Sequence, residues 1–229
     1  MMLFSPIEQV HYMYNPSHFV ENRADVLGAL LKAHPLATLV TLSHEGLVAN
    51  YIPLVLRQDG TAFGTLVGHV ARANPVWSAT DLGVNALACF QGPQVYISPS
   101  LYATKQEHGK VVPTWNYVAV QASGPLTIHD DADWIRAQVT ELTQQQEAHR
   151  KAPWAVDDAP RSYTDTMIRA LVGISIPVVA MTGKWKVSQN QPPINRTSVA
   201  EGLSQSPQET SQLMAALVRQ SAQDAARKS

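Results

Sequence analysis

Hydrogen-bonding side chains are concentrated in one short stretch of the chain, residues 114–117, directly after Pro113. They supply a hydroxyl, an indole, an amide and a phenol in succession: Thr114, Trp115, Asn116 and Tyr117. Each of these polar groups needs a partner once it leaves water, so a strand that only fills a core would not carry all four. The stretch is typical of a cleft wall that holds a flat ligand with polar edges, or of a subunit interface. The alternative is a strand end whose indole packs and whose amide caps a turn.

A second candidate group lies in residues 68–75, where His69 and Arg72 are three positions apart. We expect a strand to end at Gly68 and a short helix to follow, which places both side chains on one helical face near its start. Free backbone N–H groups and a guanidinium favour a phosphate or a carboxylate at such a position. The alternative is a surface cap around the Asn-Pro pair that ends the segment.

A third candidate group lies in residues 182–190, where an indole stands between two lysines. The residues are Lys184, Trp185 and Lys186, followed by Ser188, Gln189 and Asn190. An aromatic ring between two cations suits an anionic ligand that contains an aromatic ring. The alternative is a lysine pair that extends along a packed indole toward solvent.

Composition limits the classes of function. The chain has 229 residues, 45% hydrophobic and 15% charged, with a formal net charge of −1, so strong binding to nucleic acid through phosphates is not implied. The single cysteine, Cys89, excludes an internal disulfide and a cysteine-based zinc site, and we expect a reducing, cytoplasmic location. The first residues lack the pattern of a signal peptide, and no apolar run approaches the roughly 20 residues that span a bilayer. We expect no membrane segment and no metal site, because the aspartates at 130, 131 and 133 suit a helix N-terminus.

The hydrophobic pattern predicts a mainly β fold with additional helices, of the α+β class. Strands are expected over residues 36–42, 47–56, 61–67, 85–90, 95–98, 114–124, 126–128 and 173–181, with a tight turn at Gly92–Pro93. Helices are expected from Ser17 to Pro35, from His129 to about Lys151, over residues 162–172 with Met167, Ile168 and Leu171 inward, and in the segment 195–229. We expect residues 1–190 to form one domain and residues 191–229 a polar helical extension that packs on it or trails from it.

Five blocks of sequence, in this order and at these spacings, resemble the PaiB family, whose members are known as FMN-binding negative transcriptional regulators. The blocks are MYNPSHF, GHVARANP, FQGPQVYISPS, VVPTWNY and KWKVSQN, and the resemblance covers roughly residues 10 to 205. It implies a split antiparallel β-barrel of the kind found in flavin reductases and pyridoxamine-phosphate oxidases. It also implies a homodimer with FMN bound at the subunit interface.

Carried over by position, the resemblance implies three sets of FMN-binding residues. His69, Arg72 and Asn74 would lie by the phosphate, and Thr114, Trp115, Asn116 and Tyr117 would line the isoalloxazine side or the dimer interface. Lys184, Trp185, Ser188 and Gln189 would close the site. One departure is visible: members often carry SPSWY where this chain has SPSLY, so Leu101 replaces an indole that could stack on the flavin or on a partner chain.

Three functions remain open at this point. The first is a flavin-bound regulator that acts indirectly, because the sequence has no helix-turn-helix pattern and no basic helix to support direct DNA binding. The second is a flavin-dependent oxidoreductase that uses NAD(P)H or oxygen on a small molecule, with His69 as the candidate acid or base. The third is haem binding or breakdown, which needs an axial ligand such as His69, His108 or His129. The sequence leaves enzymatic activity open.

Overall fold

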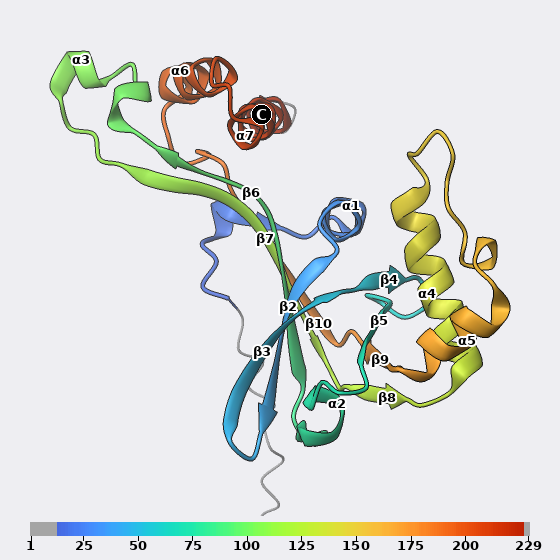
Figure 1. Cartoon of the computed structure of the whole chain (residues 1–229). Helices are drawn as coiled ribbons and strands as arrows, with labels where there is room; N and C mark the ends of the chain where they lie inside the picture. The colour runs from blue at the N-terminus through green and yellow to red at the C-terminus, as the bar shows by residue number, and fades with distance from the viewer. Residues whose placement is uncertain (1–12, 227–229) are drawn as a thin grey trace, which may run out of the picture.

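Two antiparallel sheets and a set of peripheral helices make up the computed structural model, which describes residues 13–226 (Figure 1). The strands are β1 (Val20–Glu21), β2 (Leu36–Ser43), β3 (Gly46–Pro53), β4 (Val55–Arg57), β5 (Thr65–Ala71), β6 (Ala86–Ile97), β7 (Thr114–Gly124), β8 (Thr127–His129), β9 (Leu171–Pro177) and β10 (Ala180–Lys186). The α-helices are α1 (Ala24–Ala33), α2 (Val76–Ala79), α3 (Lys105–His108), α4 (Ala132–Glu147), α5 (Arg161–Arg169), α6 (Pro193–Ser204) and α7 (Glu209–Ala226). Short 3₁₀ turns are η1 (Ser17–Phe19), η2 (Pro99–Leu101) and η3 (Val156–Asp158). The predicted mainly β architecture with rim helices is confirmed.

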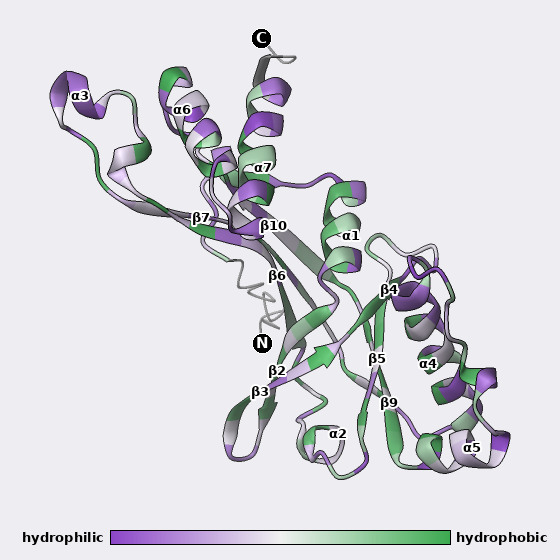
Figure 2. Ribbon diagram, turned by 45° about the horizontal axis from the view of Figure 1, so that its top comes forward, coloured by the Kyte–Doolittle hydropathy of each residue, from purple (hydrophilic) through white to green (hydrophobic). Residues whose placement is uncertain are grey.

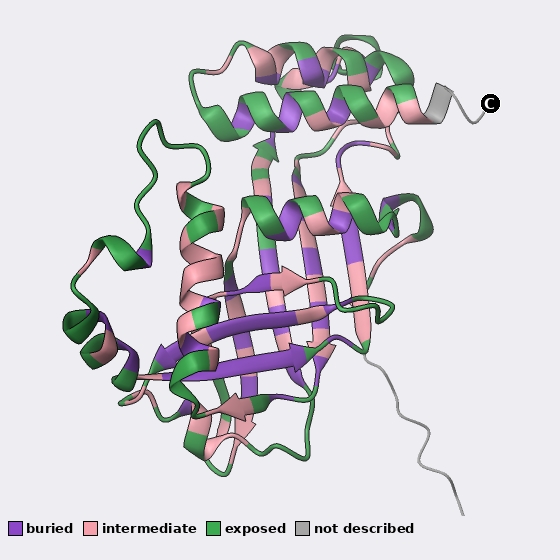
Figure 3. Ribbon diagram, turned by 90° about the vertical axis from the view of Figure 1, so that its right-hand side faces the viewer, coloured by how far each residue is buried: buried purple, intermediate pink, exposed green. Residues whose placement is uncertain are grey.

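The large sheet has the strand order β1-β10-β7-β6-β2-β3 and the small sheet the order β4-β5-β9-β8. The two sheets cross; α4 covers the small sheet, whereas α1 lies beside β4 and packs directly on β6 and β7 of the large sheet (Figure 3). The chain passes between sheets at Leu54, after Gly124 and after Pro177. A Cβ on Gly124 would lie 1.9 Å from the Pro177 carbonyl oxygen, so the two backbones approach as closely as they can at this corner.

Hydrophobic side chains from both sheets form one core. Its largest fully buried members include Leu39, Phe90, Ile97, Ile174 and Ile176. Hydrophobic residues concentrate on the strands of the small sheet and on α1, whereas α3 and α4 carry many hydrophilic ones (Figure 2). Burial of this apolar surface is the main stabilising term for such a fold.

The side chains of strand β7 alternate between the two faces of the large sheet. Val118, Val120 and Ala122 are buried on the inner face, whereas Tyr117 and Gln121 alternate with them on the opposite side and stay partly exposed. We call that opposite side the outer face, which includes Tyr51, Cys89, Tyr96, Trp115, Tyr117, Gln121 and Lys184. The predicted alternation along residues 117–122 is confirmed.

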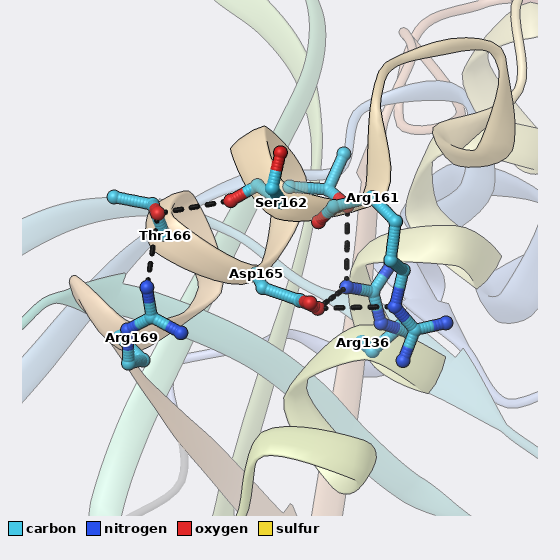
Figure 4. A network of polar contacts seen from close by, with 7 residues as sticks. Arg136, Arg161, Ser162, Asp165, Thr166 and Arg169 are labelled. Atoms are coloured by element: carbon cyan, nitrogen blue, oxygen red, sulfur yellow. Dashed lines mark hydrogen bonds and ion pairs between the residues drawn. The ribbon is translucent and has the colours of Figure 1, made fainter.

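Helices α4 and α5 cover the small sheet and are joined by a polar network. Asp165 of α5 accepts hydrogen bonds from Arg136 of α4 and from Arg161, while Thr166 accepts one from Arg169 (Figure 4). Asp131 begins α4, because its carboxylate accepts the backbone N–H of Trp134 at 2.7 Å. The helix expected over residues 162–172 corresponds to α5, which ends at Arg169. Met167 was expected to face the core, but it is 44% exposed. The helix prediction from His129 was wrong by a few residues at each end.

The predicted helix from Ser17 is only partly correct, because residues 17–19 form just the 3₁₀ turn η1. Residues 20–21 instead form the edge strand β1, whose Val20 pairs with Lys184, and the helix begins at Ala24. The periodic spacing of apolar residues could not show this, because two residues are too few for a strand pattern. The pairing of β1 with β10 joins segments that are far apart in the chain, so it could not be predicted from the local sequence.

Two glycines that were expected at the ends of strands lie inside strands instead. Gly68 is in β5, where a Cβ would lie 2.8 Å from the Pro53 carbonyl oxygen and 2.7 Å from a Leu54 methyl carbon, so it permits close approach of two chain segments. Gly92 and Pro93 form a bulge within the single strand β6 rather than a tight turn between two strands. His69 therefore lies in a strand, paired with Gly173, and the expected helical face shared with Arg72 does not exist.

The interior proline of the predicted strand 173–181 marks a corner between two strands. Pro177 ends β9, and β10 begins at Ala180, so the Lys-Trp-Lys segment is part of the large sheet. Helices α6 and α7 pack on the core rather than trailing, because Val199, Leu203, Met214 and Val218 are buried in it. The boundary at residue 190 stays a prediction.

Candidate functional site

A lysine enclosed by aromatic rings lies on the outer face of the large sheet. Lys184 is only 7% exposed, and its Nζ donates a hydrogen bond to the Tyr14 carbonyl oxygen at 2.7 Å. The same Nζ lies 5.3 Å from the ring centroid of Tyr14 and 5.4 Å from that of Tyr117. Within residues 13–226, no carboxylate forms an ion pair with Lys184. The arrangement holds an ammonium group beside two aromatic faces.

Aromatic side chains remain exposed on the same face. Trp115 is 51% exposed and contacts Tyr96, its cross-strand neighbour, edge to face with ring centroids 6.0 Å apart. Tyr51 of β3 is 74% exposed. Large aromatic surfaces that water reaches on one face of a sheet are typical of a binding interface.

Thr114, Asn116 and Ser188 meet at the far end of β7, where they line what we call the polar cavity, of about 190 Å³. The Asn116 amide is buried and donates to the Ser188 hydroxyl at 2.8 Å, and the Lys186 ammonium donates to the Thr114 hydroxyl. Ser188 has φ +68°, a left-handed conformation that a non-glycine residue adopts only when its surroundings impose it. Gln189 fixes this turn, because its side-chain oxygen accepts the Val187 N–H and its amide donates to the Trp185 carbonyl oxygen, both of which precede Ser188.

Trp185 and Gln189 face a different space, which we call the apolar cavity. It has a volume of about 550 Å³ and lies between α1, β10 and α7, with Leu30, Val118 and Leu217 among its walls. Its rim carries Arg23, which pairs with Glu21 at 2.6 Å and with Asp224 at 3.1 Å. Burial raises the pKa of Glu21, but the hydrogen bonds and charge of Arg23 outweigh burial, so this pKa lies below its usual value. Two carboxylates at the rim disfavour a phosphate there.

The predicted phosphate residues His69, Arg72 and Asn74 lie at the small sheet, and their side chains bond other residues of the chain. His69 Nδ1 is 2.6 Å from Gln138 Oε1. Arg72 pairs with Asp130 at 2.5 Å and also donates to two backbone carbonyl groups. The hydrogen bond and charge of Arg72 hold the pKa of Asp130 below its usual value. These contacts use four of the five N–H donors of Arg72, and its side chain is partly exposed, so a phosphate there would compete with Asp130.

Asn74 connects this group to the inner face of the large sheet. Its amide donates to Asn50 Oδ1 at 2.9 Å, and its Oδ1 accepts the Val76 N–H. Asn50 is paired with Leu39, a fully buried residue, so Asn50 lies on the inner face. The residues predicted to bind the phosphate therefore contact the inner face of the large sheet, whereas the exposed indole of Trp115 lies on its outer face.

The distance between these groups follows from strand geometry. Tyr51 is adjacent to Asn50 on β3. It is paired through Thr38 of β2 and Cys89 of β6 with Gln121 of β7, so three inter-strand spacings separate Tyr51 from Gln121. Tyr117 is four residues farther along β7, which gives a separation of roughly 20 Å within one protomer. One protomer alone does not bring the predicted phosphate residues and ring residues together.

The sequence missed several features of these sites. Tyr102 and Gln191 line the polar cavity, and α7 supplies one wall of the apolar cavity. Lys186 was part of the Lys-Trp-Lys motif in the sequence. Its hydrogen bond to Thr114 was not predicted, because it depends on the register of β10 against β7. Among residues 13–226 no cluster of three or more metal-binding side chains is present, and no helix combines the length and apolar character needed to cross a membrane.

Residues 13–180 match a family model described as "Putative FMN-binding domain". The chain belongs to this family. It is 31% identical to an uncharacterized protein of Emericella nidulans, over 91% of this chain and 97% of that protein. It is 28% identical to the "Protease synthase and sporulation protein PAI 2" of Bacillus subtilis, over 90% and 96% of the two chains. The predicted resemblance to the PaiB family is confirmed, and so is FMN as the cofactor of the family.

Solved structures share the fold. The FAD and heme binding protein of Mycobacterium smegmatis superposes with a TM-score of 0.52 at 16% identity, over 73% of each chain. The flavocytochrome Anf3 of Azotobacter vinelandii superposes with a TM-score of 0.51 at 13% identity, over 73% of this chain and 69% of that one. The predicted split antiparallel β-barrel of the flavin-binding type is confirmed.

Proposed function

We propose that this protein is an FMN-binding homodimer whose flavin lies between two protomers. The observation that carries the proposal is the separation of the phosphate residues from the ring residues within one protomer, on opposite faces of the sheet and roughly 20 Å apart. A single FMN is shorter than this distance. In a dimer with a two-fold axis, the phosphate residues of one protomer and the ring residues of its partner can contact the same FMN.

In this arrangement each half-site has a distinct task. His69, Arg72 and Asn74 of one protomer hold the phosphate, which competes with Asp130 for the partly exposed guanidinium of Arg72. Trp115, Tyr117 and Lys184 of the partner subunit lie against the isoalloxazine ring. The proposed site does not include the residues that line the two cavities, Thr114, Asn116, Trp185, Ser188 and Gln189, whose role as flavin contacts is untested.

The proposed role is negative regulation of transcription through the flavin-bound state rather than by direct reading of DNA. The net charge of −1 supports this, because a protein that neutralises DNA phosphates needs a basic surface. A mobility-shift titration at low salt, with FMN-loaded and FMN-free protein on fragments of the source genome, tests the idea. Tight, sequence-specific binding that is the same with and without FMN would overturn it.

A flavin-dependent oxidoreductase is the second candidate, and the fixed cation of Lys184 favours it. Bound FMN supplies hydride or electron transfer, and a positive charge held beside the ring favours the reduced, electron-rich form. FMN-dependent consumption of NAD(P)H, reduced in Lys184→Met, is the expected result. The same rate without FMN would exclude it.

Haem binding has less support from the three histidines considered as ligands. His69 contacts Gln138, and His129 stacks on Trp134 while it hydrogen-bonds Ser175 at 2.7 Å. His108 lies on α3, where its Nδ1 accepts the Lys110 N–H at 3.0 Å. A haem titration that gives a Soret band, lost on substitution of one of the three, would revive this function.

The absorbance spectrum of the purified protein, combined with its mass in solution, tests the main proposal. We expect a dimer that binds about one FMN per chain, and strong loss of FMN in Arg72→Ala. Arg150→Ala is the matched control, because Arg150 also forms an exposed ion pair, with Glu147 at 2.9 Å, but lies outside the site. A monomer that retains FMN, or an Arg72→Ala variant that binds FMN as tightly as Arg150→Ala, would refute the two-protomer site.

A further inference from the structure

The apolar cavity between α1, β10 and α7 has no role in the proposed flavin site. Helices α1 and α7 lie on the same side of the large sheet, where α1 packs on β6 and β7 and α7 packs on β6 (Figure 1). The cavity volume of about 550 Å³ is within the range of roughly 300–1,000 Å³ that small-molecule pockets occupy. Most of the residues that line it are hydrophobic. A cavity of this size and lining suits a molecule with a compact apolar body.

Small side chains keep the space between the two helices open. Ala29 and Ala33 lie one turn apart on α1, and Ala216 lies on α7. All three line the cavity and remain exposed. The sheet supplies the floor through Val118 of β7 and Trp185 of β10. Larger side chains at the three alanine positions would fill part of this space, so these positions set the width of the cavity.

The lining changes from apolar to polar along helix α7. Leu213 and Leu217 line the cavity nearer the start of the helix, and Gln220 and Asp224 line it nearer the end. At 1.5 Å per residue, Leu217 and Asp224 are about 10 Å apart along the helix axis. Asp224 pairs with Arg23, the residue directly before α1. The cavity therefore has an apolar end and a charged end, and a ligand that uses both must be amphipathic.

The charged end carries more negative than positive charge. Among the described residues that line the cavity, the lysines, arginines and carboxylates are limited to Glu21, Arg23 and Asp224, with a formal sum of −1. Arg23 engages both oxygens of Glu21, through Nε at 2.9 Å and Nη2 at 2.6 Å. Within the described residues, the side chain of Asp224 accepts a single hydrogen bond, from Arg23 Nη1 at 3.1 Å. The surplus carboxylate favours a cation and opposes an anion.

We infer that the apolar cavity binds an amphipathic cation, with one ammonium group on a compact aliphatic or aromatic body. The body packs against Leu30, Val118 and Leu217, and the ammonium group donates to Asp224. The side chain of Asp224 is 29% exposed, so solvent screens this ion pair and limits its contribution to about fivefold in affinity. The apolar body supplies the rest of the binding free energy. The site is separate from the proposed flavin site and does not depend on whether FMN binds.

Calorimetric titration of the full-length protein, with any flavin left bound, tests the inference with three probes that share one body. The probes are 1-adamantanamine, 1-adamantanol and 1-adamantanecarboxylate, which are cationic, neutral and anionic at pH 7. We expect saturable binding of the amine, about fivefold weaker binding of the alcohol, and the weakest binding of the carboxylate. Added salt should bring the affinity of the amine down toward that of the alcohol. No saturable binding of the amine, or equal or tighter binding of the alcohol or the carboxylate, would overturn the inference.

A first variant tests the charged end of the cavity. Asp224→Asn should weaken the amine about fivefold and leave the alcohol unchanged, with little effect on the unfolding temperature because the pair with Arg23 is partly exposed. Asp133→Asn, at an exposed position on α4, is the matched control and should change neither affinity. If Asp224→Asn bound the amine as tightly as Asp133→Asn does, Asp224 would not be the partner of the ammonium group and the assignment would fail.

A second variant tests the apolar body. Ala216→Phe should weaken both the amine and the alcohol at least tenfold, because the added ring occupies the cavity from an exposed position of α7. Gln223→Phe, at an exposed position of the same helix that does not line the cavity, should change neither affinity. Unchanged binding in Ala216→Phe would refute the cavity as the site. Competition between the amine and added FMN would refute a site separate from the flavin.

Discussion

Removing the exposed indole of Trp115 should weaken the dimer strongly. Trp115 is 51% exposed in one protomer, so roughly 120 Å² of the roughly 250 Å² that an indole side chain can bury is available to the partner. At about 25 cal/mol per Å² this area corresponds to about 3 kcal/mol per copy, and a two-fold dimer contains two copies. The upper bound is therefore about 6 kcal/mol, or about four powers of ten in the dimer dissociation constant. Since burial at a protein interface is incomplete, we expect at least a hundredfold for Trp115→Ala.

Sedimentation at a series of protein concentrations measures this constant directly. Trp154→Ala is the control, because Trp154 is 47% exposed and follows α4, on the far side of the small sheet. FMN titration of both variants adds a second result: the Trp115 variant should lose FMN affinity together with dimerisation, and the Trp154 variant should lose neither. A dissociation constant within threefold of wild type for Trp115→Ala would refute the outer face as the interface.

Two predictions concern stability and pH. Gly124→Ala should lower the free energy of unfolding by about 3 kcal/mol or more, because its Cβ would overlap the Pro177 carbonyl oxygen. Gly28→Ala in α1 is the matched control: its Cβ would meet no atom, so it should raise the free energy of unfolding by about 0.5–1 kcal/mol. Equal urea midpoints for the two variants would contradict this prediction. Hydrogen bonds from the threonines at 61 and 65 lower the pKa of Asp59 to about 2 from a usual 3.8, so their contribution is complete above pH 4 and is lost as the pH falls toward 2. Asp59→Asn should lose less stability than wild type between pH 4 and pH 2, and identical acid unfolding curves would exclude the effect.

Regular alternation and turn chemistry were enough to predict most strands of the fold. The residues around Val120 alternate so strictly that both faces of β7 could be assigned, and Pro35 and Pro177 both mark ends of elements. Errors arose where a glycine serves close packing. Gly68 and Gly92 look like turn residues locally, but each admits a neighbouring segment that only the assembled sheets bring near.

The candidate site was predictable in composition but not in geometry. The sequence identified Asn116 and Ser188, 72 positions apart, and the structure joins their side chains by a hydrogen bond. It placed Trp185 with them, although strand alternation sends Trp185 to the opposite side from Lys184. The face of a sheet on which a residue lies can be assigned from sequence only when the strand limits are known. The last strand was expected over residues 173–181, so most of β10 was not predicted as a strand.

This alternation in β10 leads to a last prediction, that adjacent residues of one motif act independently. Lys184 pairs with Ala119 on the outer face, whereas Trp185 pairs with the buried Val118 and lines the apolar cavity. Lys184→Met should therefore weaken FMN about tenfold with little change in stability. Trp185→Leu should cost about 2 kcal/mol of stability, since it removes part of a packed ring, and leave FMN affinity within twofold.

The double variant decides between separate faces and a shared site. If the two side chains serve different faces, the changes in FMN binding free energy and in unfolding free energy add within about 0.5 kcal/mol. If both contacted the flavin, as the motif alone suggested, Trp185→Leu would itself weaken FMN, and the two effects would couple by more than about 1 kcal/mol. Coupling of that size would return Trp185 to the flavin site and contradict the assignment of the isoalloxazine to the outer face, because no ring can contact both sides of one strand.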